Sequence, residues 1–338
     1  MAHTVCLIPG DGIGPEVAKA TRLVLDASGA ELDWKIVPAG AEAAEQYGAF
    51  LPRLTLDAIR EAGVALKGPI TTPVGRGHTS VNVALRKGLD LYAAVRPVRS
   101  MPGIKTRYEN VDIVVIRENT EGLYSGIENE IVPGVVQSLK ITTRKACERI
   151  ARFAFNYACE RGRKRITVFH KANILKMADG LFLDCSREVH RQDKHGVDYD
   201  EMIIDNGCMQ IVRDPTRFDM LLLENFYGDF ISDLCAGLVG GLGVVPGANI
   251  GDDCAVFEAV HGSAPDLAGK NVANPLALIM SGVMMLRFLG ETSPAERIRT
   301  AYDAVLEDGR KDELTRDLGG SATTNEFAKA VIRRLNGG

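Results

Sequence analysis

Short runs of hydrophobic residues alternate with longer helical patterns along most of the chain. The short runs predict buried β-strands, since a strand covered on both faces is apolar throughout; they comprise residues 4–8, 64–67, 111–116, 166–169 and 220–223. Residues 15–28 predict a helix with Pro15 in its first turn, and residues 145–161 predict an amphipathic helix. This alternation indicates an α/β architecture.

Two segments depart from the pattern. Residues 132–143 are rich in β-branched residues and predict an arm outside the main sheet. Glycines cluster in residues 237–251, which we expect to be rich in loops and to contain a domain boundary. The two ends of the chain would then build one domain around an inserted one.

Composition and charge narrow the class of protein. The chain has 338 residues, enough for about two domains. A net charge of −4 disfavours a dedicated nucleic-acid partner. The longest apolar stretch, residues 276–286, is too short to span a membrane, and residues 1–10 lack the pattern of a secretory signal. Seven cysteines without a C-x-x-C pair favour a reducing compartment, the cytoplasm.

A glycine motif follows the first predicted strand. Gly10, Gly12 and Gly14 are spaced G-x-G-x-G, whereas a dinucleotide-binding Rossmann fingerprint requires G-x-G-x-x-G. We therefore interpret the motif as a tight turn between a strand and a helix, and not as a Rossmann site.

Asp229 and Asp233 form a candidate metal site. Four residues apart on a predicted helix, their carboxylates would share one face and repel each other unless a cation lay between them. Oxygen ligands of this kind suit Mg²⁺ or Mn²⁺. The alternative is a helix start with a solvated acidic face.

Three arginines stand among polar residues suited to anions. A guanidinium matches a carboxylate with two parallel hydrogen bonds, so a substrate with several carboxylates is a sensible hypothesis. Taken singly, each arginine is more often part of a surface ion pair. The candidate residues are Ser80, Asn82, Arg86, Arg96, Arg117 and Tyr124.

Two further places could take part in chemistry. Lys171 follows a predicted strand, where a lysine can serve as an acid or base, although a solvated lysine is commoner. In the loop of residues 261–266, Asp266 could bind a ribose hydroxyl, and Asn274 would end the loop before an apolar helix. The alternative is an ordinary loop before a helix.

Taken together, these motifs resemble the β-decarboxylating dehydrogenases, the family of enzymes acting on isocitrate, isopropylmalate or homoisocitrate. The resemblance covers nearly the whole chain, is strongest in residues 7–16, 223–234, 237–251 and 314–320, and is closest to the members that oxidise isocitrate with NAD⁺. It implies a fold distinct from the Rossmann fold. Residues 1–91 and 240–338 would form a large coenzyme-binding domain, and residues 92–239 a small domain whose arm, near residues 122–145, is exchanged within a homodimer.

The resemblance also implies roles for individual residues. Tyr124 and Lys171 would be catalytic, and the substrate would meet Thr71, Ser80, Asn82, Arg86, Arg96 and Arg117. Asp205, Asp229 and Asp233 would bind the metal, with Lys171 and Asp205 supplied by the other subunit. The coenzyme would contact Lys67, Thr71, His261, Gly262, Ser263, Ala264, Asp266, Leu267 and Asn274.

The implied reaction is the oxidative decarboxylation of isocitrate to 2-oxoglutarate and CO₂, with NAD⁺ and Mg²⁺ or Mn²⁺. Ser80 and Asn82 suit a third carboxylate, where isopropylmalate enzymes carry apolar or acidic residues. Relatives that use NADP⁺ carry Lys and Tyr in place of Asp266 and Leu267, although Arg316 could partly compensate. The alternatives are a dehydrogenase for homoisocitrate, isopropylmalate or tartrate, and a non-catalytic regulatory subunit. If a transit peptide has been removed, the mitochondrial matrix replaces the cytoplasm.

Overall fold

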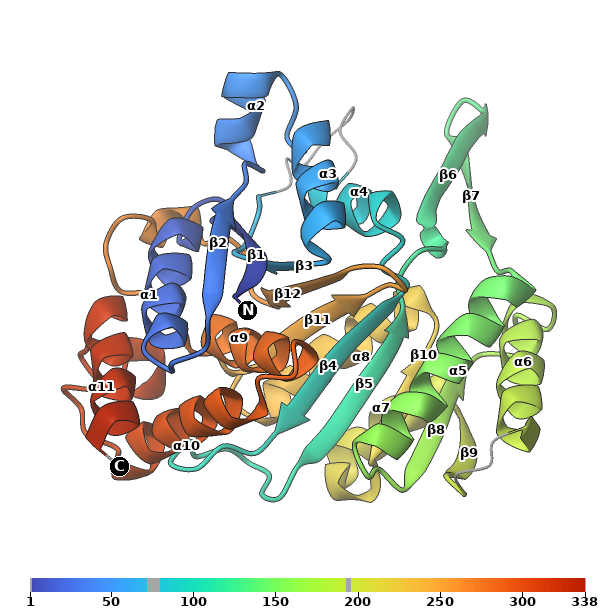
Figure 1. The fold of residues 1–338 in the computed structure, drawn as a ribbon. Helices are drawn as coiled ribbons and strands as arrows, with labels where there is room; N and C mark the ends of the chain where they lie inside the picture. Colours follow the sequence, from blue (N-terminus) through green and yellow to red (C-terminus); the bar gives the residue numbers. More distant parts are fainter. Residues whose placement is uncertain (1, 72–79, 193–195, 338) are drawn as a thin grey trace.

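A mixed β-sheet forms the centre of the computed structural model, which describes residues 2–71, 80–192 and 196–337 (Figure 1). Within these residues the sheet has ten strands. In spatial order they are β2 (Leu32–Ile36), β1 (His3–Ile8), β3 (Val64–Lys67), β12 (Ala255–Ala259), β11 (Pro246–Ile250), β4 (Ala93–Arg99), β5 (Asp112–Glu118), β10 (Met220–Leu223), β8 (Arg165–His170) and β9 (Asp198–Ile203).

The strands pair in parallel in both outer parts of the sheet and antiparallel in its middle. β11 is antiparallel to β12 and β4, and β4 is antiparallel to β5. Ala248 of β11 is level with Val95 of β4. We call this pair of strands the seam, because β11 and the strands on one side of it come from residues 1–91 and 240–338, and the rest from 92–239.

Helices cover both faces of the sheet, with α5, α9 and α10 in front of it in Figure 1 and α8 behind. They are α1 (Gly14–Asp26), α2 (Ala41–Tyr47), α3 (Arg53–Ala62), α4 (Val81–Gly88), α5 (Arg144–Glu160), α6 (Ala178–Gln192), α7 (Ile204–Arg213), α8 (Asn225–Leu238), α9 (Leu276–Phe288), α10 (Thr292–Asp308) and α11 (Thr324–Gly337). In the described part of the chain, none of them is both long and apolar enough to cross a membrane.

One hydrophobic core continues across the seam. It includes Val5 and Leu66 from one side and Ile116 and Leu221 from the other, all nearly inaccessible to solvent. The strands of the two predicted domains therefore occupy the two halves of one continuous sheet, and they meet at the seam. The division into a large and a small domain remains a prediction.

The glycine-rich segment 237–251 meets the expectation of loops only in part. The chain between α8 and β11 is irregular apart from the 3₁₀ turn Leu242–Val244, but β11 (Pro246–Ile250) lies in the centre of the sheet. Packing explains the glycine at position 247 of this strand. A Cβ atom on Gly247 would lie 2.1 Å from Nη1 of Arg96, which crosses the strand. Close approach of another group, and not a turn, accounts for this glycine.

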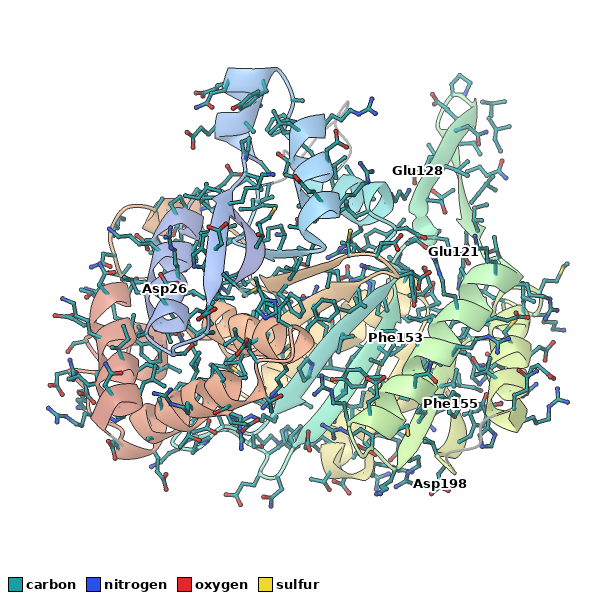
Figure 2. The ribbon with its side chains drawn as sticks, in the orientation of Figure 1. Asp26, Glu121, Glu128, Phe153, Phe155 and Asp198 are labelled. Carbon is teal, nitrogen blue, oxygen red and sulfur yellow. The ribbon has the colours of Figure 1, made fainter. Side chains whose placement is uncertain are left out.

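A hairpin outside the sheet projects from the body (Figure 1). It consists of β6 (Gly122–Val132) and β7 (Val135–Ile141), which form a separate two-stranded sheet, as the β-rich pattern predicted. Figure 2 shows Glu121 at its base and Glu128 further out. Its apolar residues are unusually exposed, including Ile131, Val132 and Val136, whose exposed fraction is 66%. A two-stranded hairpin of this kind is marginally stable alone.

Candidate functional site

A buried carboxylate near the seam gathers several cations. Glu258 of β12 bonds Nζ of Lys67 at 2.7 Å, and the guanidinium groups of Arg86 and Arg96 at 3.2 and 3.3 Å. The side-chain amide of Asn249 donates to it at 2.7 Å. Burial opposes ionisation, but the attraction of the three cations outweighs burial and holds the pKa of Glu258 well below its ordinary value.

Arg96 is buried, and one of its hydrogen-bond donors has no partner among the described residues. That donor is Nη1 of the Arg96 guanidinium. Burial lowers its pKa to about 10, helped by repulsion from Arg86 and Arg117 and opposed by Glu258. The guanidinium still carries its charge at neutral pH, so the site holds one buried donor, packed against Gly247, that has no acceptor among the described residues.

A second group of residues surrounds Asp229 on α8. One oxygen of Asp229 accepts a hydrogen bond from Nη1 of Arg117, and the other accepts one from the Tyr124 hydroxyl. Arg117 also donates to Oδ1 of Asn225 at 2.7 and 3.0 Å, which fixes its guanidinium below the Tyr124 ring. Burial, followed by the bond to Asp229, raises the pKa of Tyr124 and keeps the phenol protonated.

We call Lys67, Arg86, Arg96 and Arg117 the cationic cluster. Within the described residues, the salt bridges of these four groups go to two carboxylates, Glu258 and Asp229. The charges of Arg96 and Arg117 also act on Asp233, so four cations face three carboxylates and a positive charge is left in excess. The side-chain oxygen of Asn82, one turn before Arg86 on α4, is buried and has no partner among the described residues, and Ser80 immediately precedes α4. The arrangement fits a small molecule with several carboxylates and a hydroxyl group.

The donor set around Asp229 also fits a divalent cation. Asp233 lies one turn further along α8, and burial together with the negative charge of Asp229 raises its pKa. Two carboxylates one turn apart on a helix, whose negative charges repel each other, are a ligand pair for a hard cation. Within the described residues, however, no group of three or more acidic, histidine or cysteine side chains converges on one point. Asp205, the third predicted ligand, therefore does not complete the set within one chain.

Asp205 and Lys171 form a pair of their own. Nζ of Lys171, just after β8, bonds Oδ1 of Asp205, in the first turn of α7, at 2.6 Å. The Asp205 side chain is 68% exposed. Its bond to Lys171 lowers the pKa of Asp205. This exposed pair leaves both groups available to a neighbouring molecule.

The predicted coenzyme residues meet around the glycine motif. The Thr71 hydroxyl bonds Oγ of Ser263 at 2.7 Å, and Asp11 accepts from the backbone amides of Thr71 and Ala41, both at 2.8 Å. A Cβ atom on Gly12 would lie 2.0 Å from the carbonyl oxygen of Ser263. The motif is thus the predicted tight turn, and its glycines allow three loops to touch.

The rest of the coenzyme loop runs from His261 into the short 3₁₀ turn Pro265–Leu267. His261 Nε2 is buried and has no partner within residues 2–71, 80–192 and 196–337, which leaves one ring nitrogen for a ligand, and burial lowers the pKa of His261. Asp266 is exposed at the mouth of the loop, next to Leu267. Asn274 bonds Asp317 at 2.8 Å and also accepts the amide of Leu276 at the start of α9. An unpaired ring nitrogen beside an exposed acid suits the adenosine end of NAD⁺.

Comparison with known proteins bears on this geometry. The model of the isocitrate/isopropylmalate dehydrogenase family matches residues 4–331. The chain belongs to this family. The family assignment agrees with the resemblance drawn from the motifs, and the fold is the family's mixed α/β fold.

Individual members of the family are similar over almost their whole length. The chain is 53% identical to isocitrate dehydrogenase [NAD] catalytic subunit 5, mitochondrial, of Arabidopsis thaliana, covering 98% of this chain and 88% of that protein. It is 49% identical to a Dictyostelium discoideum protein named as a mitochondrial regulatory subunit of NAD-dependent isocitrate dehydrogenase, with coverages of 98% and 91%. The crystal structure of isocitrate dehydrogenase from Methylococcus capsulatus superposes with a TM-score of 0.94 at 49% identity, covering 98% of this chain and 99% of that one.

Within this family member, the structure brings most predicted substrate residues together and leaves Lys171 and Asp205 apart from them. Sequence reasoning missed Glu258 and Asn249, which organise the cationic cluster. A signal was present: Glu258 is the only charged residue in the apolar strand β12. An acid in a fully buried strand requires a cationic partner.

Proposed function

We propose that this chain catalyses the oxidative decarboxylation of isocitrate to 2-oxoglutarate and CO₂, with reduction of NAD⁺ and a requirement for Mg²⁺ or Mn²⁺. The observation that carries the proposal is the cationic cluster, in which four cations face three carboxylates while one buried donor of Arg96 has no partner among the described residues. The similarity to relatives named NAD-dependent isocitrate dehydrogenases supports the same reaction.

Isocitrate suits the site because it carries three carboxylates and one hydroxyl. Arg86, Arg96 and Arg117 would bind its carboxylates, and the side-chain NH₂ of Asn82 with the Ser80 hydroxyl would donate to the third carboxylate from α4. A bulky apolar substituent would leave these polar groups unpaired, at a cost of roughly 1–3 kcal/mol for each group. Homoisocitrate is one methylene longer, and a methylene is worth only about 1–3 kcal/mol of discrimination.

Two residues would move the protons. Lys171 takes the proton of the C2 hydroxyl as hydride leaves C2, and Tyr124 gives a proton to C3 after its carboxylate has departed as CO₂. The raised pKa of Tyr124 supports this role, because the phenol stays protonated near neutral pH. When bound, NAD⁺ would accept the hydride, and Asp229, Asp233 and Asp205 would hold a divalent cation that would polarise the C2 hydroxyl and its neighbouring carboxylate.

A second copy of the chain would complete each site. The exposed apolar residues of the β6–β7 hairpin and the exposed Lys171–Asp205 pair support a dimer that exchanges arms and brings these two residues to the partner's Asp229 and Tyr124. All seven cysteines are free thiols. The relatives above are named mitochondrial. We therefore place the protein in a reducing compartment, the cytosol or the mitochondrial matrix.

A non-catalytic regulatory subunit is the second candidate, since one relative at 49% identity is named a regulatory subunit. The purified chain alone decides between them. We expect it to turn over isocitrate with NAD⁺ and Mg²⁺ or Mn²⁺, faster than homoisocitrate, 3-isopropylmalate or tartrate. Activity that appears only after a different subunit is added would favour the regulatory candidate, and faster turnover of another acid would change the substrate.

A further inference from the structure

A cavity of about 470 Å³ lies on the face of the sheet opposite to the cationic cluster. We call it the rear cavity; Val95, Ala248 and Phe257 form its floor, on strands β4, β11 and β12. Nothing in the proposed reaction uses it. Its volume is within the range of cavities that hold drug-sized molecules.

The alternation of side chains places the rear cavity directly behind the site. Successive residues of a strand point to opposite faces. Val95 therefore faces the cavity while Arg96 reaches Glu258, and Phe257 faces the cavity while its neighbour Glu258 faces the cationic cluster. A ligand in the rear cavity would be separated from the cationic cluster by one layer of strands.

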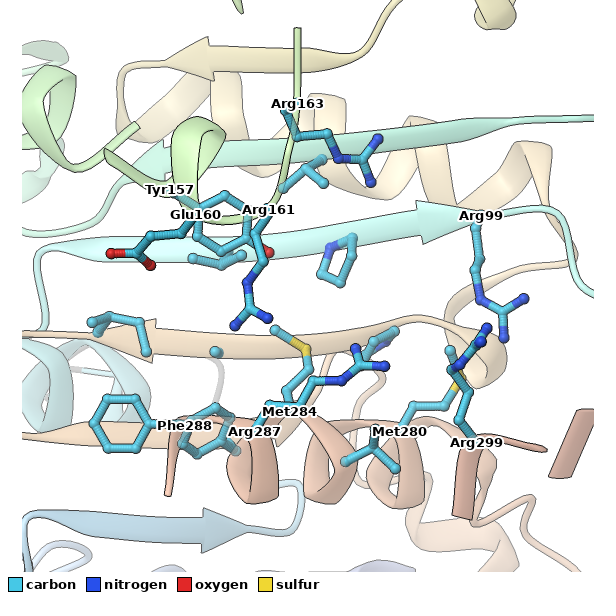
Figure 3. Close-up of a pocket in the computed structure, with 18 of the residues that line it drawn as sticks. Arg99, Tyr157, Glu160, Arg161, Arg163, Met280, Met284, Arg287, Phe288 and Arg299 are labelled. Atoms are coloured by element: carbon cyan, nitrogen blue, oxygen red, sulfur yellow. The ribbon is translucent and has the colours of Figure 1, made fainter. Parts of the chain in front are cut away.

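The walls come from both sides of the seam. Helix α5 contributes Phe153 and Tyr157 from one side, and α9 contributes Met284 and Phe288 from the other (Figure 3). Phe288 is 50% exposed, which is unusual for a large aromatic residue. Aromatic rings together with flexible thioethers adapt well to a flat or branched apolar body.

Arginines surround the opening. Arg99, Arg163, Arg287 and Arg299 each have a salt bridge to an acidic residue. Arg161, at the end of α5, has no salt bridge within the described part of the chain, and its guanidinium lies 5.6 Å from the centre of the Tyr157 ring. Figure 3 shows the guanidinium of Arg161 and the carboxylate of Glu160, which both line the cavity, directed to different sides. The lining thus offers Arg161, a cation without a salt bridge in the described part of the chain, above an apolar floor.

We propose that the rear cavity binds a small amphiphilic anion, which places its apolar body against the floor and its carboxylate or sulfonate on Arg161. Charge complementarity at Arg161 and the apolar lining together define this class of ligand. The ligand would contact helices from both sides of the seam. It would bind on the face of the sheet opposite to the one that the substrate and coenzyme would use.

The test uses 8-anilinonaphthalene-1-sulfonate, a fluorescent aromatic anion, with the full-length chain. We expect one saturable site per chain, unaffected by saturating NAD⁺. Arg161→Gln should weaken binding about tenfold, which corresponds to about 1.4 kcal/mol. Arg152→Gln, an exposed arginine on the same helix that does not line the cavity, is the matched control and should leave binding unchanged.

Two further measurements test the shape of the rear cavity and the charge of its ligand separately. Met284→Trp should fill the cavity and remove the saturable binding while the thermal unfolding temperature stays close to that of the wild type. Decanoate should displace the probe, whereas neutral decanol should displace it at least tenfold less effectively. Equal binding by Arg161→Gln and the wild type, displacement by NAD⁺, or equal displacement by decanol would each overturn the proposal. If Met284→Trp does not fold, the comparison of Arg161→Gln with Arg152→Gln decides alone.

Discussion

Two carboxylates, Glu258 and Asp229, face the same cationic cluster in different surroundings. Glu258 is 4% exposed, and its oxygens accept bonds from four side chains of its own chain. The Asp229 side chain is 44% exposed and has a second carboxylate, Asp233, one turn away. The folded chain thus completes the Glu258 side of the site by itself, whereas the Asp229 side is where we propose that a cation and a second chain bind. On this proposal, the Glu258 side stabilises the fold and the Asp229 side performs the chemistry.

The largest effect should come from the Asp229 side of the site. Asp229→Asn should reduce kcat by about 10²–10⁴-fold, because it removes a metal ligand worth several kcal/mol in the transition state. The thermal unfolding temperature should change little, since this side chain is half exposed. The exposed Asp184→Asn serves as the control for the same chemical change. Excess EDTA should also abolish wild-type turnover; turnover that persists in EDTA would contradict the role of a metal.

The second prediction tests whether two chains share the Asp229 side of the site. Tyr124→Phe and Lys171→Met should each lose about 10²–10⁴-fold in activity, since each lacks a group that transfers a proton. When the two variants are refolded together, half of the dimers are mixed and each mixed dimer has one intact site, so activity should recover towards a quarter of the wild type. Mixed dimers that are demonstrably present but inactive would place both residues in the same chain's site.

The third prediction concerns the Glu258 side of the site. Glu258→Gln should lower the free energy of unfolding by about 3 kcal/mol at pH 7, because it leaves buried cations without their carboxylate. Chemical denaturation measures the loss, and the exposed Glu307→Gln is the matched control.

The same variant has a defined pH dependence. The pKa of Glu258 is depressed in the folded state, so its stabilisation is present above the unfolded value near 4.5 and is lost as the pH falls towards the folded pKa. The difference in stability between wild type and Glu258→Gln should therefore shrink as the pH is lowered from 4.5. A difference that stays constant down to pH 3 would show that the ionisation of Glu258 is not what stabilises the cluster.

The smallest effect is expected at the exposed end of the coenzyme loop. The carboxylate of Asp266 would repel the 2′-phosphate of NADP⁺, so the wild type should prefer NAD⁺. Asp266→Lys combined with Leu267→Tyr should reduce that preference at least tenfold, about 1.4 kcal/mol. Steady-state kinetics with both coenzymes measure the ratio of kcat/KM, and Glu307→Lys controls for the change in charge. Equal efficiency of the wild type with both coenzymes would remove Asp266 from this role.

The sequence predicts the parts of the molecule that follow local rules. The strands at residues 64–67 and 220–223 coincide with β3 and β10, and the helix predicted at residues 145–161 differs from α5 by one residue at each end. Such segments succeed because burial on both faces of a strand, or on one face of a helix, leaves a periodic pattern.

The parts that depend on distant contacts could not be predicted in this way. The glycine of β11 resembles a loop signal until Arg96 is seen crossing Gly247. Glu258 acquires its role only because sheet topology brings Lys67, Arg86 and Arg96 to it from three other elements. The pattern of residues had already made Asp229 and Asp233 a candidate metal pair and Lys171 a candidate acid or base, whereas the catalytic role of Tyr124 and the metal role of Asp205 came from the family resemblance. All of these roles stay predictions.

The pairing of β3 with β12 has a consequence for how the chain is made. Lys67 and its partner Glu258 lie in neighbouring strands, yet more than half of the chain separates them in the sequence. At a synthesis rate of about 5–20 residues per second, the first three strands wait roughly 10–40 s on the ribosome before the strand that covers the β3 edge emerges. The segment 92–239 supplies a contiguous half of the sheet and can pair its own strands earlier. The middle of the nascent chain is therefore expected to fold before its beginning, with the buried Lys67 exposed to water until the end.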